Sequence, residues 1–189
     1  MKRLSTVVAF AVAVFLAASV SANEVTARAA TTTLATLERP AHFKLVDAAP
    51  SVDALIDRLL DALARNDVQA LHRLRVTEDE YRTFFLPGSV EPGQPARVYD
   101  ADSSKFYWGL INSHSLYAAD GIIKRYGGHK CRVKEKQYLK GQETYAWYDA
   151  YKTVHLVLED EDGRHAELTL GSIADVDGQF KFISLLGKS

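Results

Sequence analysis

Cysteine is nearly absent from this chain of 189 residues. The single cysteine, Cys131, has no partner for an intramolecular disulfide, so packing must hold the fold together without a disulfide framework. A charge excess is missing too, because 23 Lys and Arg stand against 24 Asp and Glu, a formal net charge of -1 at pH 7. Without a basic field, the composition indicates no nucleic-acid partner and no affinity for an anionic membrane.

Motifs that bind phosphates, nucleotides or metals are also missing. The sequence has no nucleophile elbow, no phosphate-binding loop and no dinucleotide fingerprint. The six histidines show no paired ligand spacing such as HExxH, and His129 with Cys131 would supply only two ligands. The acidic run over 159–162 lacks the spaced oxygen ligands of a calcium loop. We therefore predict no cofactor and no metal site.

One long apolar run is present, at the start of the chain. A basic pair at 2–3 precedes the apolar residues 7–18, and small residues at 20–22 form a cleavage site. A membrane-spanning helix needs about 20 apolar residues, and polar residues end this run sooner. We predict a signal peptide over 1–22, removed after Ala22. The protein is then exported, periplasmic or secreted, with no stable membrane anchor after signal removal.

The remaining chain is predicted to form a leader and one domain. Residues 23–50 are rich in Ala and Thr and keep neither a helical nor a strand period, so we expect a mobile leader. The alternative is a short strand around 42–46 that pairs onto the sheet of the domain. Residues 51–189 have the length of a single domain.

Three helical segments open this domain. Ser51 is a cap residue before apolar positions at helical spacing over 52–63. Residues 66–67 end this helix and cap a second, short one. Residues 77–80 read as a capping box that opens a third segment, which ends at the Pro-Gly pair 87–88.

A long helix follows, beginning at Ser103 or Ser104 and ending at the glycine pair 127–128. Three of the five prolines lie in the connection before it, which we interpret as a surface loop. One face of the long helix is expected to pack on the core: Tyr107, Leu110, Ile111, His114, Ala118, Gly121 and Ile122.

The C-terminal part is predicted to be a meander of antiparallel strands. Its segments are 129–139, 144–158, 164–174 and 179–186, and Asp-Gly pairs at 162–163 and 177–178 are strong hairpin signals. Helices first and antiparallel strands last define an α+β fold, with the helices packed on a strongly bent sheet.

This order of elements resembles the nuclear transport factor 2-like superfamily, which includes the ketosteroid isomerase-like enzymes. The helical phrase DALARNDVQALHRLRVTEDEY, over 61–81, looks like the usual opening of such domains. Other stretches, such as YAWYDAYK and GSIADVDGQFKFI, are similar to parts of uncharacterised exported bacterial proteins. The resemblance implies a cone-like sheet around a pocket but no activity, since enzymes, ligand carriers and structural modules share the scaffold. No position matches the catalytic motif of the isomerase-like enzymes.

The inner face of the first strand supplies the candidate chemistry. If Cys131 and Val133 face the core, the strand period of two also turns Glu135 and Gln137 inward. A carboxylate and a histidine in a dry pocket can do acid–base work, so His114 and Glu135 are the catalytic candidates. A lone histidine on an apolar face is more often a hydrogen-bonded core residue. The predicted ligand-binding set for a small apolar molecule is Tyr107, His114, Glu135, Gln137 and Tyr148.

The second strand suggests an interface. Its apolar face carries Val154 and Leu156, so Tyr145, Trp147 and Tyr151 are expected on the outer face. Clustered exposed aromatic residues are typical of interface cores, which predicts a homodimer through this sheet face. The alternative is a bulge near Asp149 that turns Trp147 inward.

These features leave three classes of function open. A non-catalytic ligand-binding or assembly module of the cell envelope is favoured, because no catalytic motif is present. The alternatives are a small-molecule lyase, isomerase or hydrolase that uses the pocket acid–base pair, and a partner-binding accessory protein. The sequence does not name a ligand.

Overall fold

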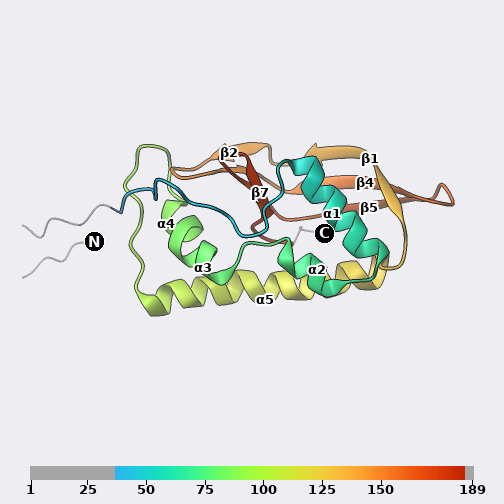
Figure 1. Cartoon of the computed structure of the whole chain (residues 1–189), viewed down its shortest axis with the longest axis horizontal. Helices are drawn as coiled ribbons and strands as arrows, with labels where there is room; N and C mark the ends of the chain where they lie inside the picture. The colour runs from blue at the N-terminus through green and yellow to red at the C-terminus, as the bar shows by residue number, and fades with distance from the viewer. Residues whose placement is uncertain (1–36, 186–189) are drawn as a thin grey trace, which may run out of the picture. The chain divides into compact units, whose positions relative to one another are not determined.

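The computed structural model describes residues 37–185, so the predicted signal peptide and the first half of the leader, 23–36, lie outside the described residues. Within this range, helices precede antiparallel strands, which confirms the α+β class (Figure 1). In the described part of the chain, no helix is long and apolar enough to cross a membrane.

Side-chain caps fix the first two helices where the sequence predicts them. Ser51 caps α1 (Val52–Ala64) by accepting a hydrogen bond from the Ala54 amide at 3.0 Å. Asp67 caps α2 (Val68–Arg73) in the same way, at 2.8 Å from the Ala70 amide. Such caps satisfy amides that have no partner inside a helix.

The third helical segment begins with the predicted capping box. The Thr77 hydroxyl accepts from the Glu80 amide, and the Glu80 carboxylate accepts from the Thr77 amide. The segment then continues without a break to the predicted Pro-Gly end. It consists of α3 (Glu78–Glu80), a π-helical turn η1 (Tyr81–Phe85) and α4 (Leu86–Gly88).

The long helix α5 (Ala101–Tyr126) forms as predicted, but its packed face agrees with the expected one only in part. Its N-cap is Asp100, three residues before the expected start. Tyr107, Leu110, His114 and Gly121 were expected in the core, and all four are exposed. The helix is apolar on two sides, so its pattern does not select one. The buried side consists of Ser104, Ser115, Ala119, Ile122 and Tyr126, so Ile122 of the expected face is buried, and Ile111 and Ala118 are half-buried.

The strands form two antiparallel sheets in place of the expected single sheet. One contains, in spatial order, β1 (Cys131–Tyr138), β4 (Val154–Asp160) and β5 (His165–Thr169). The other contains β2 (Gln142–Thr144), β3 (Asp149–Tyr151), β6 (Ile173–Val176) and β7 (Gln179–Phe182). The four predicted segments are all present. The second and third are each interrupted, at 152–153 and at 170–172, and the first is followed beyond its turn at 139–141 by the additional strand β2.

The interruptions lie side by side. The Leu139 amide donates to the Thr153 carbonyl at 3.0 Å, and the Val154 amide donates to the Gly171 carbonyl at 3.1 Å. Thr153 has a φ of 55°, a left-handed conformation that a strand cannot contain. This residue therefore separates β3 from β4, which the sequence predicts as one strand.

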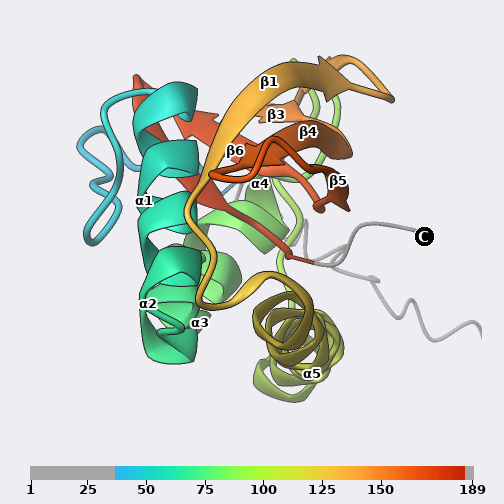
Figure 2. The ribbon, with the colours of Figure 1, turned by 90° about the vertical axis from the view of Figure 1, so that its right-hand side faces the viewer.

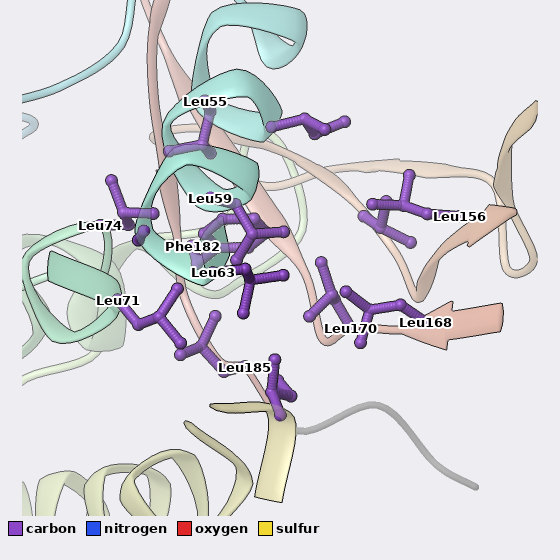
Figure 3. Close-up of a cluster of buried hydrophobic side chains, with 14 of the residues drawn as sticks. Leu55, Leu59, Leu63, Leu71, Leu74, Leu156, Leu168, Leu170, Phe182 and Leu185 are labelled. Atoms are coloured by element: carbon purple, nitrogen blue, oxygen red, sulfur yellow. The ribbon is translucent and has the colours of Figure 1, made fainter. Parts of the chain in front are cut away.

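Two clusters of buried side chains form the core. The larger lies between α1, α2 and the sheets, and Figure 3 shows leucines of the helices facing those of the strands. Each fully buried leucine stabilises the fold by about 1.5–3 kcal/mol. Members of this cluster include Leu55, Leu59, Leu63, Leu71, Leu156, Leu168, Leu170 and Phe182. The second cluster is aromatic and includes Phe84, Phe85, Trp147 and Tyr148.

The packed part of the chain begins before the predicted boundary at 51. Ala49 is 1% exposed, and its amide and carbonyl exchange hydrogen bonds with Phe180 of β7. Leu45 is buried as well, and its amide donates to the Gln179 side chain at 3.0 Å. A sheet contact was the alternative expectation for this segment, and it occurs at Ala49, beyond the expected strand at 42–46.

Candidate functional site

A β-bulge removes Glu135 and Gln137 from the predicted pocket. Val133 pairs with Leu158 and Glu135 with Val157, so Lys134 is an extra residue in β1. One extra residue reverses which side chains point inward. Glu135 and Gln137 are therefore exposed, and they hydrogen-bond to each other.

The predicted acid–base pair is not assembled. His114 lies on the exposed face of α5, as does Tyr107, which is 42% exposed. Glu135 is exposed on β1. No hydrogen bond or ion pair joins His114 to Glu135 in the described range, and neither is desolvated, so they lack the dry environment that the acid–base hypothesis requires.

Tyr148 is the one member of the predicted ligand set that is buried. Burial, followed by the neighbouring Tyr145, Tyr81 and Glu143, raises the pKa of its hydroxyl far above the usual range. It lines a pocket of about 200 Å³ together with Tyr145 and Lys152. The Lys152 ammonium donates to the Tyr145 hydroxyl at 2.9 Å and contacts Glu143 at 2.9 Å. Tyr145 is thus half-buried in a polar network.

The aromatic residues of the predicted interface are less exposed than expected. Trp147 is 5% exposed and lies in a turn closed by the Tyr145 amide, which donates to the Tyr148 carbonyl at 2.8 Å. Its ring contacts Phe84 at a centroid distance of 5.4 Å. Trp147 therefore points inward, and the cause is this turn rather than a bulge at Asp149. Tyr151 is half-buried. With Trp147 buried as well, the sheet face lacks the exposed aromatic cluster on which the dimer prediction was based.

A different pocket, centred on Arg75, has the features of a binding site. It lies between α2, the connection to α3, β7 and α5, and encloses about 380 Å³. The backbone at Arg75 is fixed by β7, because the Val76 amide donates to the Phe182 carbonyl at 2.9 Å. Its lining residues include Asp47, Gln69, His72, Arg73, Arg75, Trp108, Asn112, Leu116 and Lys181.

The Arg75 side chain is buried but only partly hydrogen-bonded. It is 4% exposed, and its Nη2 donates to the Asn112 amide oxygen at 2.9 Å. The guanidinium carbon lies 5.9 Å from the centre of the Trp108 ring. Its Nε is buried and has no hydrogen-bond partner in residues 37–185. A buried donor without a partner is rare, because it costs about 1–3 kcal/mol.

Arg75 also lacks a counter-charge among the described residues. The buried charged side chains of residues 37–185 are Arg75, Glu80 and Lys181. Lys181 and Glu80 form an ion pair at 3.0 Å, and the Glu80 carboxylate also accepts from the amides of Val46 and Thr77, each at 2.6 Å. No carboxylate pairs with Arg75 in this part of the chain. Burial lowers its pKa, but an arginine remains cationic at neutral pH.

His72 lies beside this charge. Its Nδ1 is buried and has no hydrogen-bond partner within residues 37–185. Burial, and then the positive charge of Arg75, lower the pKa of His72, while Asp120 acts in the opposite direction. The remaining charged residues of the lining, Asp47 and Arg73, are exposed at the rim. The interior therefore carries one uncompensated positive charge and a neutral imidazole.

The sequence holds a weak signal for this site. Lys181 stands between two phenylalanines, and Arg75 between a leucine and a valine. A strand or turn that is covered on both faces buries a charged residue between two apolar ones, whereas a strand with one solvent-exposed face leaves the charged residue exposed. The coverage depends on tertiary contacts of β7 with α2 and the 45–49 segment, which no local pattern specifies.

In comparisons with known proteins, no family model, no curated protein and no solved structure matches this chain. Residues 37–185 contain no group of three or more His, Cys, Asp or Glu side chains that could hold a metal ion.

Proposed function

We propose that this protein binds a small organic monoanion, a carboxylate with a flat apolar group, in the Arg75 pocket. The observation that carries the proposal is the buried guanidinium of Arg75, which within residues 37–185 has an unused Nε and no counter-charge. It corresponds to the ligand-binding class favoured by the sequence, with a charged ligand in place of the expected apolar one.

Charge argues for an anionic ligand. Removing a cation from water costs several kcal/mol unless an opposite charge and hydrogen bonds replace the lost hydration. A carboxylate at the Nε edge of Arg75 would supply both once the side chains that cover Nε move aside, since a guanidinium matches a carboxylate with parallel hydrogen bonds. Because Lys181 is neutralised by Glu80, one net charge is available, which favours a monoanion over a dianion.

The shape of the pocket argues for an apolar group on the ligand. Trp108 and Leu116 project from α5 beside Asn112, so the pocket has an apolar wall next to its polar centre. The Asn112 amide nitrogen remains available as a second donor, because its oxygen already accepts from Arg75. Few polar groups within an apolar lining are typical of small-molecule sites.

We also propose that the protein is exported through the signal peptide over 1–22 and belongs to the nuclear transport factor 2-like superfamily. The basic and apolar pattern of 2–18 supports export. The order of elements and the aligned interruptions at 139–141, 152–153 and 170–172 support a bent, cone-like sheet. In such an exported module, the Arg75 pocket would capture its ligand outside the cytoplasm.

Titration with benzoate tests the binding proposal. Benzoate should bind and raise the unfolding temperature, since a ligand at a hundredfold excess over Kd stabilises by about 2.7 kcal/mol. Benzamide, which has the same shape without charge, should bind at least about tenfold more weakly, and phenyl phosphate and inorganic phosphate test the preference for a carboxylate. Arg75→Leu should lose at least about tenfold in benzoate affinity, equivalent to 1.4 kcal/mol.

The matched control for this titration is Arg65→Gln, which removes an exposed arginine of the α1–α2 connection. Its benzoate affinity should equal that of the wild type. Equal binding of benzoate and benzamide would contradict the proposal. Unchanged benzoate affinity in Arg75→Leu would place the anion elsewhere.

Benzoate affinity should rise as the pH falls below 6.5, the ordinary pKa of histidine. The pKa of His72 is lowered in the free protein, so the imidazole gains its charge only below that value and then adds a second positive charge beside Arg75. Calorimetric titrations at successive pH values, in the range where benzoate stays ionised, measure this slope. His72→Gln should remove it. A wild-type affinity that is flat or falls toward acid would contradict the expected role of His72.

A further inference from the structure

The outward side of α5 is an exposed apolar face. Its large apolar residues are Phe106 at 63%, Tyr107 at 42%, Leu110 at 44% and Tyr117 at 81% exposure. At 3.6 residues per turn, they lie on one side of the helix together with Ser113, His114 and Gly121. Figure 2 looks along α5, and α1 and the sheets lie to one side of it. Trp108 and Asn112 of the Arg75 pocket belong to a different side, so this face is separate from that pocket.

The glycine within this face is not required by any contact in residues 37–185. A Cβ added at Gly121 would meet no atom within 4 Å, and the same holds at Gly109. Glycine inside a helix costs stability relative to alanine, because it loses more backbone freedom on folding. Nothing in the described part of the chain requires the small residue, but a side chain from a second molecule packed against the helix would.

We propose that this face joins two copies of the chain, with the two α5 helices antiparallel about a two-fold axis near Ser113 and His114. These two residues are the centre of the 26-residue helix. In an isologous contact, residues equally far from the centre meet. Phe106 then lies against Gly121 of the partner subunit, and Leu110 against Tyr117 of the partner subunit. A large side chain meets a glycine, so the face is complementary to itself.

Charge selects the antiparallel arrangement. The first turn of α5 carries Asp102, and its last turn carries Lys124 and Arg125. Two antiparallel helices bring the acidic end of each to the basic end of the other. Their dipoles are then antiparallel, which is the favourable arrangement. A parallel pair would bring like charges together. This self-complementarity favours a second copy of the chain over an unrelated protein as the occupant of the face.

Sedimentation equilibrium of the purified protein, over micromolar to submillimolar concentrations, tests this proposal. The wild type should show a monomer–dimer equilibrium, with an affinity in the micromolar range because one helix pair buries less than a standard interface. Gly121→Leu should weaken the dimer by at least about tenfold, a loss of 1.4 kcal/mol. The same change should raise the unfolding temperature of the monomer, since leucine is a better helix former. A general folding defect would lower both the dimer affinity and the unfolding temperature.

Charge-reversal variants test the antiparallel arrangement of the dimer more specifically. Asp102→Lys and Arg125→Asp should each weaken the dimer, and the double variant should restore it, because the charges exchange places across the two-fold axis. Leu139→Ser, which removes an exposed apolar residue outside α5, is the matched control and should leave dimerisation unchanged. A monomer at every concentration would overturn the proposal. So would a dimer that ignores the α5 variants and responds only to Tyr151→Ala, since that result would place the contact on the sheet face.

Discussion

Lys181→Met should destabilise the protein by about 3–5 kcal/mol, the usual cost of removing one partner of a buried ion pair. Lys181 is 1% and Glu80 is 3% exposed, and their charged groups are 3.0 Å apart. Without the ammonium, the Glu80 carboxylate would remain buried with only the amides of Val46 and Thr77 as partners. Urea denaturation, followed by circular dichroism, measures the change in free energy of unfolding.

The double variant Lys181→Met with Glu80→Gln separates charge from packing. The glutamine oxygen can still complete the capping box with Thr77, and the two new side chains carry no charge, but the glutamine NH2 group cannot accept from the Val46 amide as the second carboxylate oxygen does. Part of the lost stability should therefore return, because uncharged replacements of a buried pair are often neutral or stabilising. Lys134→Met, at an exposed lysine paired with Glu159, should cost less than about 1 kcal/mol. A loss for Lys181→Met as small as for this control would mean that the pair is not buried.

Trp147→Ala should destabilise the fold by about 3–5 kcal/mol, the range for deleting a large aromatic side chain from a core. The ring is buried against Phe84, and Gly88 approaches so closely that an added Cβ would lie 2.7 Å from Trp147. The cavity left behind is bordered by helix and turn backbone that cannot easily close. Chemical denaturation of wild type and variant gives the difference directly.

The same variant distinguishes an inward from an outward Trp147. Val98→Ala, at a side chain that is 72% exposed, is the control and should change stability by less than about 0.5 kcal/mol. An outward tryptophan at an interface would behave like this control in stability and would instead weaken self-association. That pattern would contradict the position of Trp147 in the aromatic cluster.

Local chemistry explains which elements the sequence predicts. Ser51 and Thr77 cap their helices through hydrogen bonds to amides three residues away, so the neighbouring residues contain all the required information. The hairpin glycines Gly163 and Gly178 have φ values of 76° and 79°, the conformation that their Asp-Gly pairs indicate. The helix order and the four strand segments follow from such signals.

Tertiary contacts decide the features that the sequence does not specify. The bulge at Lys134 changes the phase of β1 by one residue, and this change alone moves Glu135 from the predicted pocket to the surface. The face of α5 is ambiguous, because Tyr107 and Leu110 are as apolar as the residues that pack. Arg75 is buried by contacts from α5 and β7, which lie far from it in the sequence. The candidate site therefore depends on long-range packing and not on a motif.

The most direct test of the anion site is the ¹⁵N–¹H correlation of the Arg75 Nε–H group during a benzoate titration. The resonance is assigned by its absence in Arg75→Lys. A carboxylate that accepts from Nε should shift this proton strongly downfield and slow its exchange with water, because the group has no partner in the described structure. Benzamide at the same concentration should leave it nearly unchanged. An Arg75 Nε–H resonance that stays in place while benzoate saturates the protein would contradict the account.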